Sequence, residues 1–269
     1  MGNSNGGIGR TWRLGVVSFL NAKPLIAGLD AMKDVELIYA VPSRLPPLLD
    51  AGAVDVALVP VIDLGRNQSR WQIVSDACIG CDGETLTVRV FSKVPPGEVH
   101  TLYVDGDSHT SVALAAVVWK ELYGRSLRIM PLLEGEGVSE CEAVLLIGDK
   151  VVSRRPGGFD VEIDLGAAWK TLTSLPFVFA VWAAPRELEV AKLAPRLEHA
   201  RNAGVSAAPQ IAARFGPAHG WPVALAEEYL MHRLRFTLGD REQRGMTKFI
   251  ETARASGLLL PSVQEPVCT

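Results

Sequence analysis

Hydroxyl side chains gather just before a long apolar segment of the chain. The stretch DGDSHTS places Ser108, Thr110 and Ser111 around His109, and residues 111–123 after it have helical spacing. Hydroxyls and free backbone amides at a helix start can bind an anion such as a carboxylate. A plain N-cap is the alternative interpretation, but it uses only one serine or threonine. These four residues are therefore candidates for binding a carboxylate of the substrate.

Other polar residues lie where strands end or helices begin. Asn21 follows the first predicted strand in SFLNAKPL, and an amide there can donate and accept hydrogen bonds at once. A local turn is the competing interpretation, because Asn is a common turn former. Ser43 in PSRL is a second candidate for substrate binding at a helix start, with an N-cap role favoured. Thr85 and Thr87 share one face of a strand, which alone indicates only strand formers.

The sequence gives no indication of a metal or a cofactor. Cys78 and Cys81 form one CxxC, whereas a structural zinc site wants two more ligands at matched spacing, and Cys141 and Cys268 lie far away. The histidines show no metal-binding pattern. No GxGxxG, GxxxxGK[ST], HExxH or GxSxG occurs in a suitable context. We therefore expect neither a metal nor a cofactor.

Charge and composition limit the partners. The 269 residues carry a net charge of -3, with 48% hydrophobic and 21% charged residues, which is ordinary for a globular protein with a buried core. We see no electrostatic reason to expect nucleic acid as a partner. No apolar run reaches the roughly 18 residues of a transmembrane helix, so we expect no membrane partner. Because no signal-peptide pattern follows Arg10 and the four cysteines fit a reducing compartment, we predict a cytoplasmic protein.

The elements that would position these residues alternate between strand and helix, which predicts an α/β fold. Gly124 should end the helix over 111–123, Asp164 should open another, and the chain after Pro185 is helical almost to its end. Strands are expected at 14–19, 35–40 and 85–92, and in VDVALVP, WQIVSDA, HTLYVD, SLRIMPLL, EAVLLIGD and LPFVFAVWA.

This order predicts two α/β lobes joined by two crossings. Lobe 1 would contain residues 11–94 and 184–269, because the C-terminal helices return to it, and lobe 2 would contain residues 98–178. Residues 1–10 would form a disordered leader. A cleft between two such lobes carries loops and helix starts on its walls, and ligands favour sites between domains.

Several of these segments together resemble the chorismate dehydratase family of the futalosine pathway of menaquinone synthesis. They span residues 14–184, and SFLNAKPL and LPFVFAVWA are specific in combination. The family resembles a type II periplasmic-binding-protein fold, which implies a two-lobed chain with an interdomain cleft. The matching segments are SFLNAKPL, VPSRLPPLLDAGAVDVALVPV, VRVFSK, DGDSHTSVAL, LLIGD and DLGAAWKTLTSLPFVFAVWA.

The resemblance implies which residues act on the substrate. Asn21 matches the family's active-site Asn in the LN motif, and Thr87 stands where the family usually has Ser, so a hydroxyl is kept. SHTS is similar to the family's S-R-T-S, with His109 in place of Arg. Ser174 stands where Gly is common before LPF. The CIGC pair is not part of the family pattern.

The implied reaction converts chorismate to 3-[(1-carboxyvinyl)oxy]benzoate. The ring loses hydrogen from C3 and hydroxyl from C4 and becomes aromatic. Asn21 and Thr87 are poor bases near neutral pH, so we hypothesise that the enolpyruvyl carboxylate of the substrate takes the proton. His109 is the alternative acid or base. The competing functions are a non-catalytic protein of the same fold that binds small carboxylates, and the paralogous dihydroxynaphthoate-forming enzyme.

Overall fold

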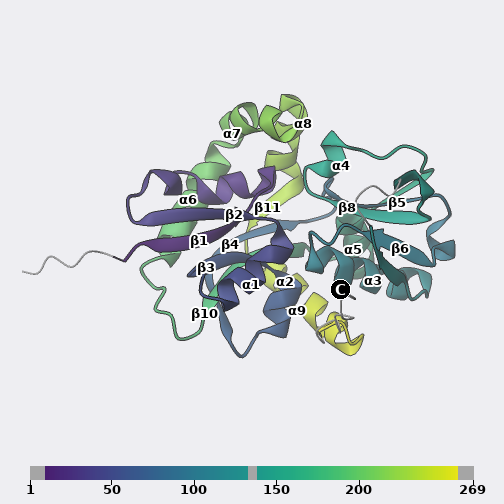
Figure 1. Cartoon of the computed structure of the whole chain (residues 1–269), viewed down its shortest axis with the longest axis horizontal. Coiled ribbons are helices and arrows are strands. Elements are labelled where there is room, and N and C mark those ends of the chain that lie inside the picture. The colour runs from purple at the N-terminus through teal and green to yellow at the C-terminus, as the bar shows by residue number, and fades with distance from the viewer. Residues whose placement is uncertain (1–9, 133–137, 260–269) are drawn as a thin grey trace, which may run out of the picture.

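Two β-sheets lie side by side in the computed structural model, which describes residues 10–132 and 138–259 (Figure 1). The predicted leader therefore falls almost wholly outside the described residues. The six-stranded sheet has the order β11-β4-β10-β3-β1-β2 and the five-stranded sheet the order β7-β6-β8-β5-β9. This arrangement is the two-lobed α/β fold that the sequence predicts.

The strands occupy most of the segments expected from the sequence. The exceptions are β9, which no expected strand covers, and β11, which falls in a stretch predicted to be helical. The alternating burial of β11 is typical of a strand at a sheet edge. The strands are β1 (Trp12–Val17), β2 (Val35–Ala40), β3 (Val56–Pro60), β4 (Trp71–Cys81), β5 (Val88–Ser92), β6 (Thr101–Val104), β7 (Arg128–Pro131), β8 (Ala143–Ile147), β9 (Val161–Asp164), β10 (Phe177–Pro185) and β11 (Leu234–Thr237).

Capping residues mark the end of α3 and the start of α5, as the sequence predicts. Gly124 ends α3 with a left-handed φ of 63°, and the Asp164 carboxylate accepts hydrogen bonds from the first amides of α5. The α-helices are α1 (Leu45–Asp50), α2 (Val61–Arg66), α3 (His109–Tyr123), α4 (Lys150–Ser153), α5 (Leu165–Thr173), α6 (Ala194–Ser206), α7 (Ala208–Phe215), α8 (Val223–Glu228) and α9 (Asp240–Ala255).

Short helical turns fill the connections. η7 is a π-helical turn and the other six are 3-10 turns. They are η1 (Leu20–Ile26), η2 (Leu29–Ala31), η3 (Pro42–Arg44), η4 (Pro96–Glu98), η5 (Val138–Glu140), η6 (Pro217–His219) and η7 (Tyr229–Arg233).

The chain passes from the first sheet to the second and back. In the first sheet β1 runs parallel to β2 and β3, while β10 and β11 run antiparallel to their neighbours. In the second sheet β6 runs parallel to β7 and β8, and β5 pairs antiparallel with β8 and β9. Because β5 pairs within the second sheet and β10 within the first, we propose lobe boundaries at 82–87 and 174–177.

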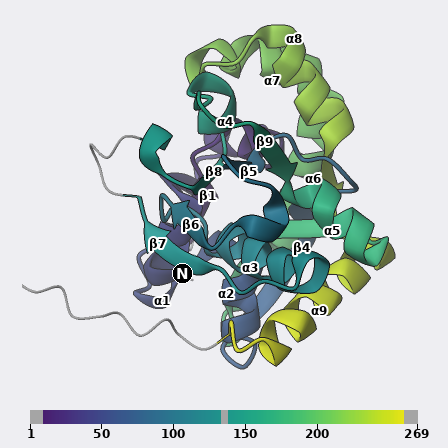
Figure 2. The same ribbon diagram turned by 90° about the vertical axis from the view of Figure 1, so that its right-hand side faces the viewer.

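Helices cover both faces of the first sheet. Figures 1 and 2 show α1, α2 and α9 on one side of it and α6, α7 and α8 on the other. The C-terminal elements α6, α9 and β11 contact β4 or β10, so this part of the chain packs on the first sheet. One core cluster runs through both lobes, and a smaller one covers the other face of the second sheet, formed by Phe91, Val144, Leu146 and Val151.

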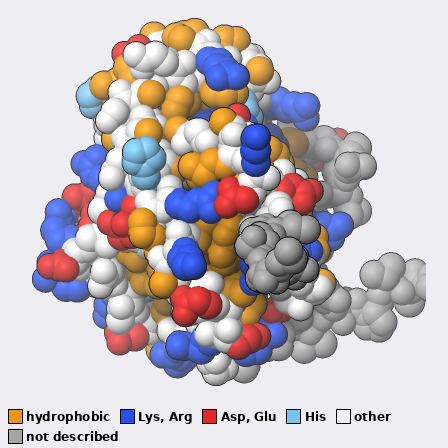
Figure 3. Space-filling view, turned by 90° about the vertical axis from the view of Figure 1, so that its left-hand side faces the viewer, with side chains coloured by type: hydrophobic (Ala, Val, Ile, Leu, Met, Phe, Trp, Pro, Cys, Tyr) orange, Lys and Arg blue, Asp and Glu red, His pale blue; other side chains and the backbone are white. Residues whose placement is uncertain are grey.

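The surface carries both signs of charge. On the face drawn in Figure 3, Lys and Arg side chains are interspersed with Asp and Glu. Within residues 10–132 and 138–259, no helix has the length and apolar character needed to cross a membrane.

Candidate active site

A narrow cavity lies between the two sheets, with about 40 Å³ open to the centres of water-sized molecules. Its walls come from the ends of strands in both lobes and from η1, η7 and the start of α3. The apolar lining residues are Val17, Phe19, Pro42, Pro60, Ile79, Val88, Ile147, Gly148, Phe179, Ala180 and Leu234. The polar lining residues are Asn21, Thr85, Thr87, Ser108, Ser111 and Tyr229.

Four of the seven predicted site residues line this cavity together. They are Asn21 and Thr87, named as catalytic, and Ser108 and Ser111, named as substrate-binding. They come from η1, the segment before β5, and the start of α3. The cleft therefore collects side chains that lie up to 90 positions apart in the sequence.

A buried tyrosine links the two predicted catalytic residues. The Tyr229 hydroxyl lies 2.7 Å from Thr87 Oγ1 and also hydrogen-bonds the Asn21 side chain. Burial raises the pKa of Tyr229, although these two hydrogen bonds act in the opposite direction. Tyr229 therefore stays a neutral phenol that can donate one hydrogen bond and accept another.

This network leaves the Asn21 side-chain oxygen for a ligand. Among the described residues, the buried Asn21 Oδ1 has no hydrogen-bond partner, so the Asn21 amide nitrogen is the donor to Tyr229. Either hydroxyl can be the donor in the Tyr229–Thr87 hydrogen bond. Asn21 Oδ1 remains an acceptor for a group on a ligand. A buried polar atom without a partner is costly, so a donor on a bound ligand would stabilise Asn21 Oδ1.

The start of α3 combines the two roles considered for it. Ser108 is the N-cap: its Oγ accepts from the Ser111 amide at 3.2 Å and lies 3.0 Å from Ser111 Oγ. Both serines are nearly buried and both line the cavity. The cap thus holds two hydroxyls at the positive end of a 15-residue helix, where a carboxylate is favoured.

Thr110 and His109 lie outside the lining and connect the lobes instead. Thr110 Oγ1 accepts from the Ile62 amide at 3.2 Å, near the start of α2. His109 Nδ1 lies 2.8 Å from Asp63 Oδ2, and its side chain is 40% exposed. Both contacts join α3 of the second lobe to α2 of the first.

Ser43 also lies outside the lining, and its predicted N-cap role is wrong. It belongs to η3, and α1 starts only at Leu45, with no side-chain cap on its first turn. The Ser43 amide donates to the Asp107 carbonyl at 3.0 Å. The two prolines after Leu45 lack amide hydrogens, which reduces the need for a cap.

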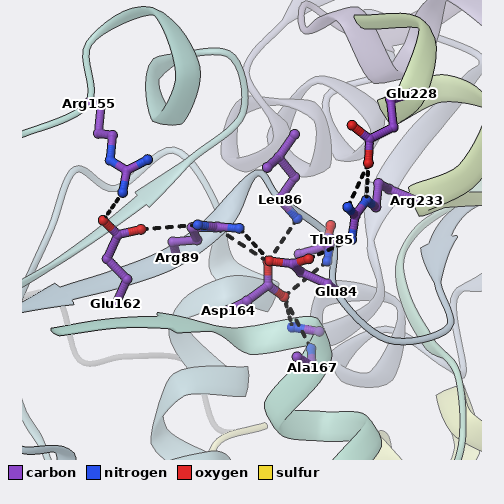
Figure 4. Close-up of polar contacts among 11 residues, drawn as sticks. Glu84, Thr85, Leu86, Arg89, Arg155, Glu162, Asp164, Ala167, Glu228 and Arg233 are labelled. Carbon is purple, nitrogen blue, oxygen red and sulfur yellow. Dashed lines mark hydrogen bonds and ion pairs between the residues drawn. The ribbon is translucent and has the colours of Figure 1, made fainter. Parts of the chain in front are cut away.

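A polar network holds the segment that carries Thr85 and Thr87 (Figure 4). The Asp164 carboxylate accepts from the amides of Thr85 at 3.0 Å and Leu86 at 2.8 Å. Leu86 has a φ of 68°, a left-handed conformation that is unfavourable for a branched side chain. Burial raises the pKa of Asp164, while the amide hydrogen bonds oppose that rise. The network fixes the backbone of the crossing between the lobes just before Thr87.

The charge of the lining is low. Of the lining residues, all of which the structure describes, none is Asp, Glu, Lys, Arg or His. The one titratable side chain in the lining is the Tyr229 phenol. A ligand with carboxylates would therefore be held by hydroxyls and helix amides rather than by a salt bridge.

Asp149 ties the second lobe to the first beside the cavity. Its carboxylate accepts from the Leu20 amide at 3.2 Å and from Trp221 Nε1 at 2.8 Å, and lies 2.6 Å from His219 Nδ1. Asp149 directly precedes α4, but its side chain makes no capping hydrogen bond to that helix. Partners 70 or more positions away use both of its oxygens instead.

The cysteine pair does not form a ligand site. Cys78 and Cys81 lie three positions apart on β4, so the alternation of a strand directs their side chains to opposite faces. Burial raises the pKa of both thiols. Within the described residues no group of three or more His, Cys, Asp or Glu side chains is arranged to hold a metal ion.

Comparisons with known proteins agree with this geometry. The family model described as menaquinone biosynthesis matches residues 12–255. A chorismate dehydratase of Thermus thermophilus is 30% identical over 260 residues, which cover 90% of this chain and 95% of that protein. A protein of Archaeoglobus fulgidus has a similar structure, with a TM-score of 0.72 and 16% identity over 92% of this chain and 98% of that one. The periplasmic aliphatic sulphonate-binding protein of Escherichia coli has a TM-score of 0.63 and 12% identity, covering 94% of each chain.

Proposed function

Because the chain belongs to the menaquinone biosynthesis family, we propose that it removes water from chorismate, a hydro-lyase reaction that yields 3-[(1-carboxyvinyl)oxy]benzoate. The 30% identity to the Thermus thermophilus chorismate dehydratase supports this substrate. The binding-protein fold supports a small molecule between the lobes. We place the reaction in the cytoplasm, with neither membrane nor nucleic acid as a partner.

The proposal rests on the types of residue that line the cavity. Phe19, Ile79, Ile147 and Phe179 give apolar walls for a carbon ring. Ser108 and Ser111 offer hydroxyls at the start of α3 for one carboxylate. A small dicarboxylate with a hydroxylated ring fits this combination.

The proton acceptor follows from the same lining. Asn21, Thr87 and Tyr229 are not bases near neutral pH, and burial raises the pKa of Tyr229 further. We therefore assign the proton on C3 to the enolpyruvyl carboxylate of chorismate itself. The C3–H electron pair forms the C3–C4 double bond, the C4–O bond breaks, and the proton leaves with the hydroxide as water. A cavity without cations favours this step, because an unpaired carboxylate is a stronger base than one held by Arg.

The roles of the neutral residues follow from their free groups. Asn21 Oδ1, which lacks a partner among the described residues, can accept from the C4 hydroxyl. The Thr87 O–H can donate to the departing oxygen or to the enolpyruvyl carboxylate. These contacts would orient the reacting atoms, and orientation alone can supply a large part of a rate enhancement.

His109 is the alternative acid or base. Its Nδ1 is engaged by Asp63, and it lies outside the lining of the cavity. This placement supports the substrate carboxylate as the acceptor. We place Ser43 and Thr110 next to the site rather than in contact with the substrate, because their hydrogen bonds join the two lobes.

The competing function is binding without catalysis, as the fold of the sulphonate-binding protein allows. Calorimetry with chorismate, followed by mass analysis of the same sample, separates the two. We expect binding and a product lighter by one water. Binding with chorismate recovered intact would favour a carboxylate-binding protein. If chorismate is recovered intact and the protein instead converts the cyclic substrate of the dihydroxynaphthoate-forming enzyme, the paralogous function is favoured.

A further inference from the structure

Asp149 lies outside the cavity lining and contacts residues next to the Asn21–Tyr229–Thr87 network. It follows Gly148, whose amide donates to the Thr87 carbonyl at 2.8 Å. Gly148 lines the cavity at a left-handed φ of 66°, and a Cβ there would lie 2.7 Å from the Phe19 ring. The close approach of Phe19 therefore needs glycine, and it fixes the position from which the Asp149 side chain leaves the second lobe.

The first branch of contacts leads to Asn21. The Asp149 oxygens lie 3.2 and 3.3 Å from the Leu20 amide, which opens η1. Leu20 is fully buried and directly precedes Asn21. A shift of this turn would move the Asn21 side chain within the cavity.

The second branch leads to Tyr229. Trp221 Nε1 donates to Asp149 at 2.8 Å, and the Trp221 indole stacks on the Tyr229 ring with centroids 4.7 Å apart at 20°. Trp221 is 3% exposed and Tyr229 is 1% exposed, so neither ring can move without repacking. Asp149 therefore fixes the ring that hydrogen-bonds both Thr87 and Asn21.

We propose that Asp149 is a positioning residue that assembles the Asn21–Tyr229–Thr87 network when the second lobe meets the first. This inference rests on the proposed dehydration of chorismate. His219, which lies 2.6 Å from the second Asp149 oxygen, holds the carboxylate in this orientation. Asp149 acts through Leu20 and Trp221 rather than on the substrate.

The sharpest test removes one hydrogen bond and keeps the stacked ring. Trp221→Phe deletes the Nε1 donor but leaves an aromatic ring against Tyr229. Its matched control is Trp71→Phe, because Trp71 is also 3% exposed and its Nε1 donates to Asp50 at 3.2 Å, away from the cavity lining. We expect Trp221→Phe to lower kcat by about tenfold to a hundredfold, as loss of a hydrogen bond to a charged group allows. KM should change by less than about threefold, since the loss is felt in the transition state.

A second experiment tests the contact between Asp149 and η1 without an activity assay. Hydrogen exchange of the Leu20 amide should speed up in Asp149→Ala and stay slow in Trp71→Phe, because Asp149 accepts that hydrogen bond. Asp149→Asn keeps one oxygen acceptor and should restore most of the turnover lost in Asp149→Ala. This rescue separates positioning from a simple loss of stability.

The outcomes are distinct. If Trp221→Phe and Trp71→Phe have the same kcat as the unchanged protein, or if Asp149→Ala raises only KM, Asp149 has no positioning role. If the unchanged protein leaves chorismate intact, the proposed function fails instead, and the exchange arm still reports whether Asp149 holds η1.

Discussion

Removal of the Tyr229 hydroxyl should damage turnover far more than it damages the fold. Tyr229→Phe keeps the ring that stacks on Trp221 and deletes the oxygen that lies 2.7 Å from Thr87 Oγ1. Thr87 and Asn21 then lose a shared buried partner, which costs about 1–3 kcal/mol of stability. For a chain of this size, each kcal/mol lowers Tm by about 2–4 °C.

The effect on catalysis has a different origin. Without the phenol, nothing among the described contacts fixes the Thr87 hydroxyl relative to the Asn21 amide. A displacement of about 1 Å in a reacting group can cost on the order of a hundredfold in rate. We therefore expect kcat to fall by about that factor, with a smaller change in KM.

Steady-state kinetics and thermal melts on two variants test this reasoning. Tyr123→Phe is the matched control, because Tyr123 also packs on an indole, that of Trp119, with centroids 5.4 Å apart, and lies outside the cavity lining. It should keep the turnover of the unchanged protein. A Tyr229→Phe protein with unchanged kcat would refute the role of the network. An equal loss of kcat in both variants would show a general effect of losing a phenol.

Four further predictions follow from single contacts. Thr87→Ser should keep turnover, whereas Thr87→Val should lower it by about tenfold or more in steady-state assays, because only the hydroxyl orients the substrate. His109→Ala should keep substantial activity in steady-state assays, since His109 contacts Asp63 outside the cavity; an inactive, folded variant would assign the proton to His109. Ser174→Gly should raise stability by about 0.5–1 kcal/mol in urea melts, because Ser174 has a φ of 60°; no gain would contradict this. Burial would raise the pKa of Asp55, but hydrogen bonds from its arginine partners outweigh it and lower that pKa. Asp55 therefore stabilises the fold above about pH 4 and loses this effect as pH falls. Asp55→Asn should flatten the acid side of the plot of Tm against pH. An unchanged plot would contradict a stabilising contact between Asp55 and its arginine partners.

Local signals explain which parts of the fold the sequence predicts well. Gly124 and Asp164 mark helix ends because caps depend on residues that are close in sequence. Ser174, noted only because the related family has Gly there, turns out to need a left-handed backbone. The strand β11 was missed, because its four residues follow a helical stretch and are paired only with the distant β4.

The candidate site was also predicted only in part, because some of its contacts join residues that are distant in the sequence. Asn21 and Thr87 were proposed from the family resemblance, and the structure brings them to one cavity. Tyr229 was missed because its hydroxyl meets Thr87 across 142 positions, and no local pattern announces that contact. No local pattern indicates the contacts of Asp149 either, because its partner Leu20 lies 129 positions away.

The central claim is that this cavity removes the C3 hydrogen and the C4 hydroxyl of chorismate. Chorismate labelled with deuterium at C3, incubated with the unchanged protein and analysed by mass, tests it directly. We expect an aromatic product without deuterium, lighter than the labelled substrate by one singly deuterated water. Labelled chorismate recovered intact, or a product that retains the deuterium, would contradict it.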